Sequence, residues 1–167
     1  MLKCGCVSVP LMKYGLITVF CTLVTSASAA TTLCLSDESS LFSCRAGTKV
    51  ISVCGSKDLA PDRGHLQYRF GSPNNVELTI PPDHLVPPAS SALAGTLMFS
   101  GGGGDYLRFK AEGYEYVVYT AIGKGWGEKD GVAIIKDGKR LAHISCTDEP
   151  VSKLWTRPIY QSWFEAR

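Results

Sequence analysis

About eight short runs of β-prone residues recur along this chain, and their spacing constrains the fold more than any other feature. In Leu66–Phe70 and Val76–Ile80 the apolar side chains alternate, which is typical of strands that place one face on a core. No segment has a sustained 3.6-residue apolar period that would indicate a long helix. The runs are Lys49–Cys54, Leu66–Phe70, Val76–Ile80, Thr96–Phe99, Tyr106–Phe109, Tyr114–Ala121, Gly131–Lys136 and Arg140–Cys146.

The residues between these runs favour tight antiparallel connections. Asp137-Gly138 separates two runs by two residues that accept the positive φ of a type I′ turn, and Ala111–Gly113 joins another pair. Pro81-Pro82 marks a rigid exposed connection. We therefore predict an all-β fold, a small antiparallel β-barrel or sandwich of about eight strands.

The N-terminus reads as a secretory signal peptide over residues 1–30. Met12 and Lys13 precede a short apolar run, and small residues follow up to Ala30. We expect Met12 to be the true start, although a longer charged region beginning at residue 1 is the alternative. The apolar run is shorter than the roughly 20 residues that span a bilayer. Phe20 stands before Cys21 where a lipoprotein signal would have a small residue, which argues against lipidation.

Charge excludes two classes of partner. The chain has 17 Lys+Arg and 15 Asp+Glu, and removal of residues 1–30 takes away Lys3 and Lys13 but no acid. The remaining chain of about 137 residues, one domain in length, is then neutral. A neutral chain without a basic stripe predicts neither nucleic acid as a partner nor a polybasic membrane anchor.

The cysteines indicate an oxidising compartment, periplasmic or secreted. Four of the seven follow residue 30: Cys34, Cys44, Cys54 and Cys146. Four cysteines allow three pairings. A hairpin around Gly47 would leave Cys54 nearer Cys34, so we prefer Cys34–Cys54 and Cys44–Cys146. We expect no metal and no cofactor, because no Cys-x-x-Cys spacing occurs and the three histidines are scattered in the sequence.

Domain organisation follows from these features. Residues 31–146 form the predicted β domain, and residues 147–167 form a C-terminal tail. The tail carries four aromatic residues, Trp155, Tyr160, Trp163 and Phe164. These rings need burial, so we expect the tail to pack on the domain; docking to a partner is the alternative.

Two glycine-rich segments are the candidate binding elements. Phe99–Tyr106 reads FSGGGGDY and lacks the Lys-Ser/Thr of a phosphate loop. It is either a bulged hairpin connection or an exposed loop that presents Ser100, Asp105 and Tyr106, with Gly101 among the expected contacts. Ile122–Gly131 reads IGKGWGEKDG. In it, Trp126 is either a contact anchor or a lid over the end of the core, and Lys129 follows it.

Catalysis has little support in the sequence, so we predict that the chain is not an enzyme. His143 lies within a strand-like run beside the last cysteine, and His65 and His84 lie at loop edges. A triad needs a positioned histidine. Paired acids could hydrolyse a glycosidic bond, but no acid has an obviously apolar setting that would raise its pKa.

Four motifs follow one another along the chain: FSCRAGTKVISV at Phe42–Val53, Ser100-Gly101 before Tyr106, the run Lys129–Ala133, and Cys146 in the last strand. Together they resemble the periplasmic inhibitors of C-type lysozyme. The order is similar over about 100 residues. The resemblance implies a protruding loop that blocks a lysozyme cleft. The two catalytic carboxyls of the lysozyme would accept hydrogen bonds from Ser100 and a charge-assisted hydrogen bond from Lys129. Tyr106 would contact the cleft or brace the loop.

The predicted function is therefore an exported protein that binds a protein partner, first of all a lysozyme-type glycan hydrolase. The expected contact residues are Ser100, Gly101, Tyr106, Trp126 and Lys129. The alternatives are a structural or adaptor module of the cell envelope without inhibitory activity and, less favoured, a small hydrolase. The oligomeric state stays open.

Overall fold

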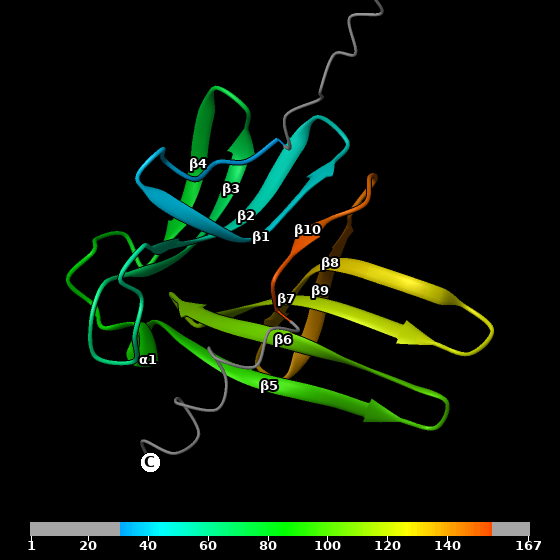
Figure 1. Cartoon of the computed structure of the whole chain (residues 1–167). Coiled ribbons are helices and arrows are strands. Elements are labelled where there is room, and N and C mark those ends of the chain that lie inside the picture. The colour runs from blue at the N-terminus through cyan, green and yellow to red at the C-terminus, as the bar shows by residue number, and fades with distance from the viewer. Residues whose placement is uncertain (1–30, 155–167) are drawn as a thin grey trace, which may run out of the picture.

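The alternating runs do form strands, and these build two antiparallel sheets that face each other (Figure 1). The computed structural model describes residues 31–154. The first sheet has the strand order β10-β1-β2-β3-β4, with bounds Val151–Ser152, Glu38–Ala46, Lys49–Ser56, Leu66–Ser72 and Asn75–Ile80. The second is β5-β6-β7-β8-β9, with bounds Ala92–Phe99, Gly102–Ala111, Tyr114–Gly123, Gly127–Lys136 and Lys139–Ser145. The all-β sandwich is confirmed, with ten strands within the described residues rather than about eight.

Tight turns join successive strands where the sequence predicted them. Asp137 and Gly138 have φ of 49° and 72° between β8 and β9, and Glu112 and Gly113 have φ of 51° and 78° between β6 and β7. Gly47, with φ of 64°, turns β1 into β2. Positive φ at both central residues of the first two turns, and at the first central residue of the Gly47 turn, matches the twist of the flanking strands, which explains why these hairpins are short.

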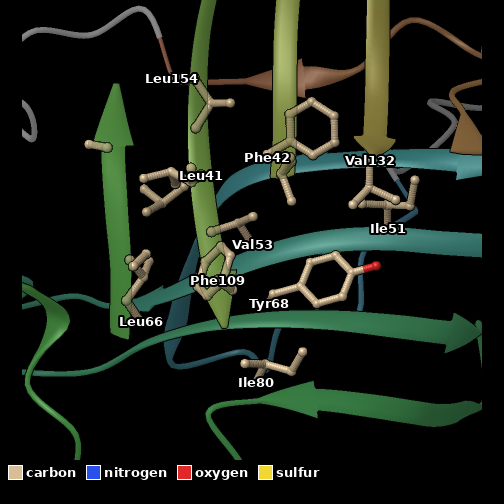
Figure 2. Packing of buried hydrophobic residues seen from close by; sticks show 14 of the residues in the cluster. Leu41, Phe42, Ile51, Val53, Leu66, Tyr68, Ile80, Phe109, Val132 and Leu154 are labelled. Carbon is tan, nitrogen blue, oxygen red and sulfur yellow. The ribbon is translucent and has the colours of Figure 1, made fainter. Parts of the chain in front are cut away.

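The core lies between the inner faces of the two sheets. Figure 2 shows Phe109 and Val132 of the second sheet pointing toward Phe42, Val53 and Tyr68 of the first. All five are essentially inaccessible to solvent. The Tyr68 and Phe109 ring centroids are 5.9 Å apart. Burying such a cluster is the main favourable contribution to folding.

The outer face of the first sheet is also covered, which the alternation did not predict. Residues 31–37 run across it, as the blue segment in Figure 1 shows. The Leu33 amide donates to Ser52 Oγ at 3.0 Å, and Arg69 Nη1 donates to the Leu33 carbonyl at 3.0 Å. Ser43, Ser52 and Arg69 are consequently buried although they point away from the core. Their polar atoms need partners there, and the covering segment supplies them.

Both disulfides form as predicted. Cys34–Cys54 ties the covering segment to β2, with Cα atoms 5.3 Å apart. Cys44–Cys146 joins β1 to the end of β9 at 5.6 Å and so links the two sheets. Two disulfides in one small domain indicate an oxidising environment outside the cytoplasm.

The segment after β9 packs on the first sheet as far as the structure describes it. The Thr147 amide donates to the Arg45 carbonyl, the Lys153 amide donates to that of Leu41, and Leu154 is buried in the core. The predicted packing of residues 155–167, and the signal peptide over 1–30, lie outside the described residues. The one helix within 31–154 is α1 (Pro88–Ser91), and no helix there is long enough to cross a membrane.

Of the two alternatives for the glycine run, the hairpin connection describes it and the exposed loop does not. Only Ser100 and Gly101 form the turn, while Gly102, Gly103 and Gly104 are strand residues of β6. A Cβ at Gly104 would lie 2.2 Å from the Thr120 carbonyl oxygen and 2.7 Å from the Ala121 Cα. Strands β6 and β7 approach each other so closely here that no side chain fits, which is a structural reason for the glycines.

We expect Gly104→Ala to lower the free energy of unfolding by about 1–3 kcal/mol, the usual cost of forcing atoms into filled space. Its new methyl group would meet backbone atoms, which cannot rotate away. Urea denaturation measures the effect. Ser100→Ala, in the exposed neighbouring turn, is the control and should stay within about 0.5 kcal/mol of the parent. Equal stability of the two variants would show that β6 and β7 can separate at no cost.

Candidate functional site

The turns β5–β6 and β7–β8 lie side by side at one end of the second sheet. The Lys124 amide donates to the Gly101 carbonyl at 2.8 Å, which joins the two turns directly. Positive φ at Gly101, Gly125 and Gly127 allows both turns. We call this end the tip surface and define it by its exposed residues, which are Met98, Phe99, Ser100, Gly101, Ile122, Lys124, Trp126 and Lys129.

Trp126 is the centre of the tip surface. A Cβ at Gly123 would lie 2.2 Å from the indole ring, so the ring rests on the bare glycine backbone. The centroid of the Phe99 ring is 5.6 Å from that of Trp126. Lys129 Nζ lies 5.2 Å from the indole centroid, a cation–π distance. The indole is thus held in place by glycine, aromatic and cation contacts while part of it stays in solvent.

The tip surface is apolar and exposed at once. Met98 is 89% exposed, Ile122 48%, Phe99 42% and Trp126 40%. Single exposed apolar residues are normal on a protein surface, but a group of them marks an interaction site. Phe99 and Trp126 form such a group on one face of the sheet, and Met98 and Ile122 are neighbours on the opposite face. Lys124 and Lys129 supply positive charge here, and the exposed Glu128 supplies one negative charge.

Four of the five predicted contact residues meet at this surface. Ser100, Gly101, Trp126 and Lys129 lie in or beside the two turns. Tyr106 does not join them. It is paired with Gly95 and Tyr119 in the middle of the sheet, and its ring lies over Gly95. The binding role of all five residues stays a prediction, and Phe99, Met98 and Ile122 are members that the sequence analysis missed.

A row of acids and threonines lies behind the tip on the inner face of the second sheet. Thr96, Asp105, Thr120 and Asp130 are cross-strand neighbours on β5 to β8. Burial raises the pKa of both aspartates, while hydrogen bonds from Thr96 to Asp105 and from Thr120 to Asp130 act in the opposite direction. The expectation that no acid has a setting that raises its pKa is therefore wrong for these two.

Such carboxyls are the usual candidates for acid–base chemistry, because a raised pKa keeps a proton available. Here each aspartate accepts a hydrogen bond from a threonine hydroxyl, Asp105 from Thr96 and Asp130 from Thr120. Asp130 also lines a cavity of about 210 Å³, together with Glu128 and Glu149. The cavity is negatively lined and would favour cationic groups. That the chain is not an enzyme remains a prediction.

The histidines at the loop edges come together, although they are far apart in the sequence. The His65 and His84 rings stack with centroids 3.9 Å apart. His65 Nε2 lies 2.8 Å from Glu38 Oε1, and His84 Nε2 lies 3.0 Å from Gln67 Oε1. Glu38, His65 and His84 could in principle hold a metal ion.

Arg69 disfavours that use of the cluster. Its two Nη atoms each donate to a different oxygen of Glu38 at 2.7 Å, and the Leu35 amide donates to the same carboxylate. A cation would have to compete with the guanidinium for this carboxylate. The cluster is best described as an ion network that fixes the covering segment on the first sheet.

No protein-family model, curated protein or solved structure matches this chain. The functional argument below therefore uses the tip surface itself. Trp126 and Lys129 were found from the sequence because a tryptophan among glycines stands out. Met98 lies in a run that the sequence analysis assigned to a strand, so nothing marked it as exposed. Phe99 begins the first glycine-rich segment, but its ring was not singled out.

Proposed function

We propose that this chain is an exported protein, periplasmic or secreted, that binds a protein partner through the tip surface. The observation that carries the proposal is the exposed apolar group around Trp126 at the joined hairpin turns. Tryptophan is among the residues that are enriched at the energetic hot spots of protein interfaces. The glycine support beneath Trp126 orders the ring before binding, which reduces the entropy lost on association.

The class of partner that we propose is a lysozyme-type glycan hydrolase. The order of motifs from Phe42 to Cys146 resembles periplasmic inhibitors of such enzymes. The two joined turns form the end of four adjacent strands, and Lys124 and Lys129 bring positive charge to it beside the single acid Glu128. A hydrolase cleft carries two catalytic carboxyls, which would attract these ammonium groups. The bound tip would exclude substrate without any reaction of the inhibitor.

An envelope adaptor is the second candidate. The apolar residues of the tip surface, Met98 above all, would serve any protein contact. The two candidates differ in one respect: an adaptor binds its partner without slowing glycan hydrolysis.

We expect the mature protein to slow the clearing of a cell-wall suspension by C-, G- or I-type lysozyme at micromolar excess. Trp126→Ala should weaken the inhibition about 30-fold, since truncating an interface anchor costs about 2 kcal/mol or more. Lys129→Ala should weaken it less, and more strongly at low salt.

Leu85→Ala is the matched control, because Leu85 is 88% exposed but belongs to the connection between the sheets. It should inhibit as the parent does. Thermal melting of each variant separates lost binding from lost folding. Failure to slow any lysozyme would refute inhibition and favour the adaptor. Equal inhibition by the Trp126 variant and the parent would refute the tip surface as the contact.

A further inference from the structure

Two aromatic rings lie across glycines on the outer face of the second sheet, the face that points away from the core. A Cβ at Gly95 would lie within 2.6 Å of three atoms of the Tyr106 phenol, and one at Gly123 would lie within 2.5 Å of three atoms of the Trp126 indole. Both rings are partly exposed. Each ring therefore rests on bare backbone with one side and offers the other side to solvent.

Further rings extend this surface across the middle of the sheet. Tyr119 is the cross-strand partner of Tyr106, so both side chains lie on the same face. The His143 ring stacks on the Tyr119 ring with centroids 5.8 Å apart, and His143 Nε2 is hydrogen-bonded to the tyrosine hydroxyl. The small residues Gly104 and Ala121 lie between this group and the tip surface on β6 and β7, so a ligand could continue along these two strands.

Basic side chains gather on the same face. Alternation along β6 to β9 places four cations and one acid there, which are Arg108, Lys110, Lys129, Arg140 and Glu115. Glu115 is shared by Arg108 and Lys110 at 3.3 Å and 3.1 Å, so it neutralises only one of them. The remaining acids of these strands point to the inner face; they are Asp105, Glu128 and Asp130. The outer face is therefore positive although the chain after residue 30 is neutral.

The cations lie beside the rings. Arg108 Cζ is 5.5 Å from the centroid of the Tyr106 ring. Burial raises the pKa of the Tyr119 hydroxyl, and the nearby charge of Arg140 acts in the opposite direction. The tip surface repeats the arrangement, with Lys129 over the Trp126 indole. A ligand stacked on these rings would therefore meet a positive charge beside each group of rings.

We propose that this outer face binds an acidic polysaccharide. The C–H faces of sugar rings stack on aromatic rings, and carboxylates accept charge-assisted hydrogen bonds from arginine and lysine. The Trp126 ring and the tyrosine pair lie four residues apart along β7, a distance of about 13 Å. A linear chain of a few charged sugars matches both the row of rings and the sign of the charge. This ligand is additional to the protein partner of the tip surface.

A single-stranded nucleic acid is the other polyanion that stacks on aromatic rings beside cations. The acidic polysaccharide is favoured because both disulfides indicate an oxidising environment outside the cytoplasm. The chain also lacks the net positive charge that usually accompanies the binding of phosphate backbones. The experiment includes both ligands.

Calorimetric titration of the full mature chain with a hexamer of galacturonic acid tests the proposal. The methyl ester of this hexamer keeps the sugar rings without the charge. It should bind at least about tenfold more weakly, because several exposed ion pairs are lost and each contributes a few-fold. Polyacrylate has carboxylates without sugar rings, and a deoxythymidine hexamer has bases and phosphates. Both should bind more weakly than galacturonate.

Two variants separate stacking from charge. Tyr119→Leu keeps apolar volume but removes the ring, so it should weaken both forms of the hexamer about tenfold. Arg140→Gln should weaken the charged hexamer about threefold and leave the ester unchanged. Lys139→Gln is the matched control, since it removes the same charge one residue away on the opposite face of β9. It should bind both hexamers as the parent does, and thermal melting checks that each variant is folded.

Four results would overturn the proposal. They are no binding of galacturonate by the parent, equal binding of acid and ester, unchanged binding by Tyr119→Leu, and tighter binding of polyacrylate or deoxythymidine. The last would assign the face to charge alone or to nucleic acid. None of them bears on the tip surface, because lysozyme inhibition that depends on Trp126 is measured separately.

Discussion

Replacing Cys44 and Cys146 with alanine should lower the free energy of unfolding by about 4–5 kcal/mol. The bond closes a chain segment of 102 residues, and the cost of closing a flexible loop rises with its length. It also joins β1 of the first sheet to the end of β9 of the second. Without it, only packing and the segment after β9 hold those two regions together.

The second disulfide supplies an internal comparison. Cys34–Cys54 spans 20 residues, so the same loop-closure argument gives it about 3 kcal/mol. Urea denaturation of the two double-alanine variants should therefore rank Cys44–Cys146 as the larger loss. The reverse order would mean that tethering residues 31–37 over buried polar groups matters more than loop length.

The fold was predictable because it depends on local patterns. Alternating apolar residues marked the strands, and Asp137-Gly138 marked a hairpin that has the expected positive φ values. The disulfide pairing followed from the hairpin at Gly47, which sets where Cys44 and Cys54 lie. These features are short-range, and each constrains the chain on its own.

What escaped prediction depends on contacts between distant residues. The glycines after Gly101 are typical of a loop, but they are residues of β6. They are glycines because the backbone of β7 passes too close to leave room for side chains at Gly102 and Gly104. His65 and His84 stack although 19 positions separate them, because β3 begins beside the connection that carries His84. Ser52 and Arg69 alternate with core residues of β2 and β3, and the covering segment explains why they are buried as well.

The tip surface falls between these two cases. Sequence reasoning found Trp126, Ser100 and Lys129 separately, and the hydrogen bond between the two turns places them together. Tyr106 was grouped with them on its distance from Ser100 in the sequence. Six residues of an extended strand span about 20 Å, so the Tyr106 ring lies in the middle of the sheet, far from the tip surface.

The buried ion pair between Glu38 and Arg69 gives the second large effect. The Glu38 side chain is 1% exposed and that of Arg69 is 7% exposed. Removing the carboxylate leaves a guanidinium in the interior without its counter-charge. We therefore expect Glu38→Gln to cost about 3–5 kcal/mol, the typical loss when one partner of a buried pair is removed.

A double variant tests whether the unpaired charge is the cause. Replacing Glu38 with leucine and Arg69 with methionine together removes both charges and keeps apolar volume. Such replacements of buried pairs are often neutral or stabilising. We expect the double variant to regain most of the stability lost in Glu38→Gln. If the double variant is as unstable as the single one, the hydrogen bonds to residues 33 and 35 matter more than the charges.

Acid should act on the same pair. Burial alone would raise the pKa of Glu38, but hydrogen bonds from Arg69, the Leu35 amide and His65, with the charge of Arg69, hold it at about 2. A carboxyl whose pKa is lowered on folding stabilises the fold fully above its unfolded pKa of about 4.5. That contribution disappears as the pH falls from about 4.5 through about 2.

The pKa shifts of Asp105 and Asp130 are opposite in sign to that of Glu38, because burial raises the pKa of both aspartates. Their protonation favours the fold as the pH falls toward the ordinary aspartate range, so it offsets part of the loss from Glu38. Melting curves of the parent protein should therefore show a net loss of stability below about pH 4.5. The Glu38→Gln variant should show a much smaller loss. An acid loss of equal size in both proteins would assign it to other carboxyls and overturn the role of Glu38 in acid sensitivity.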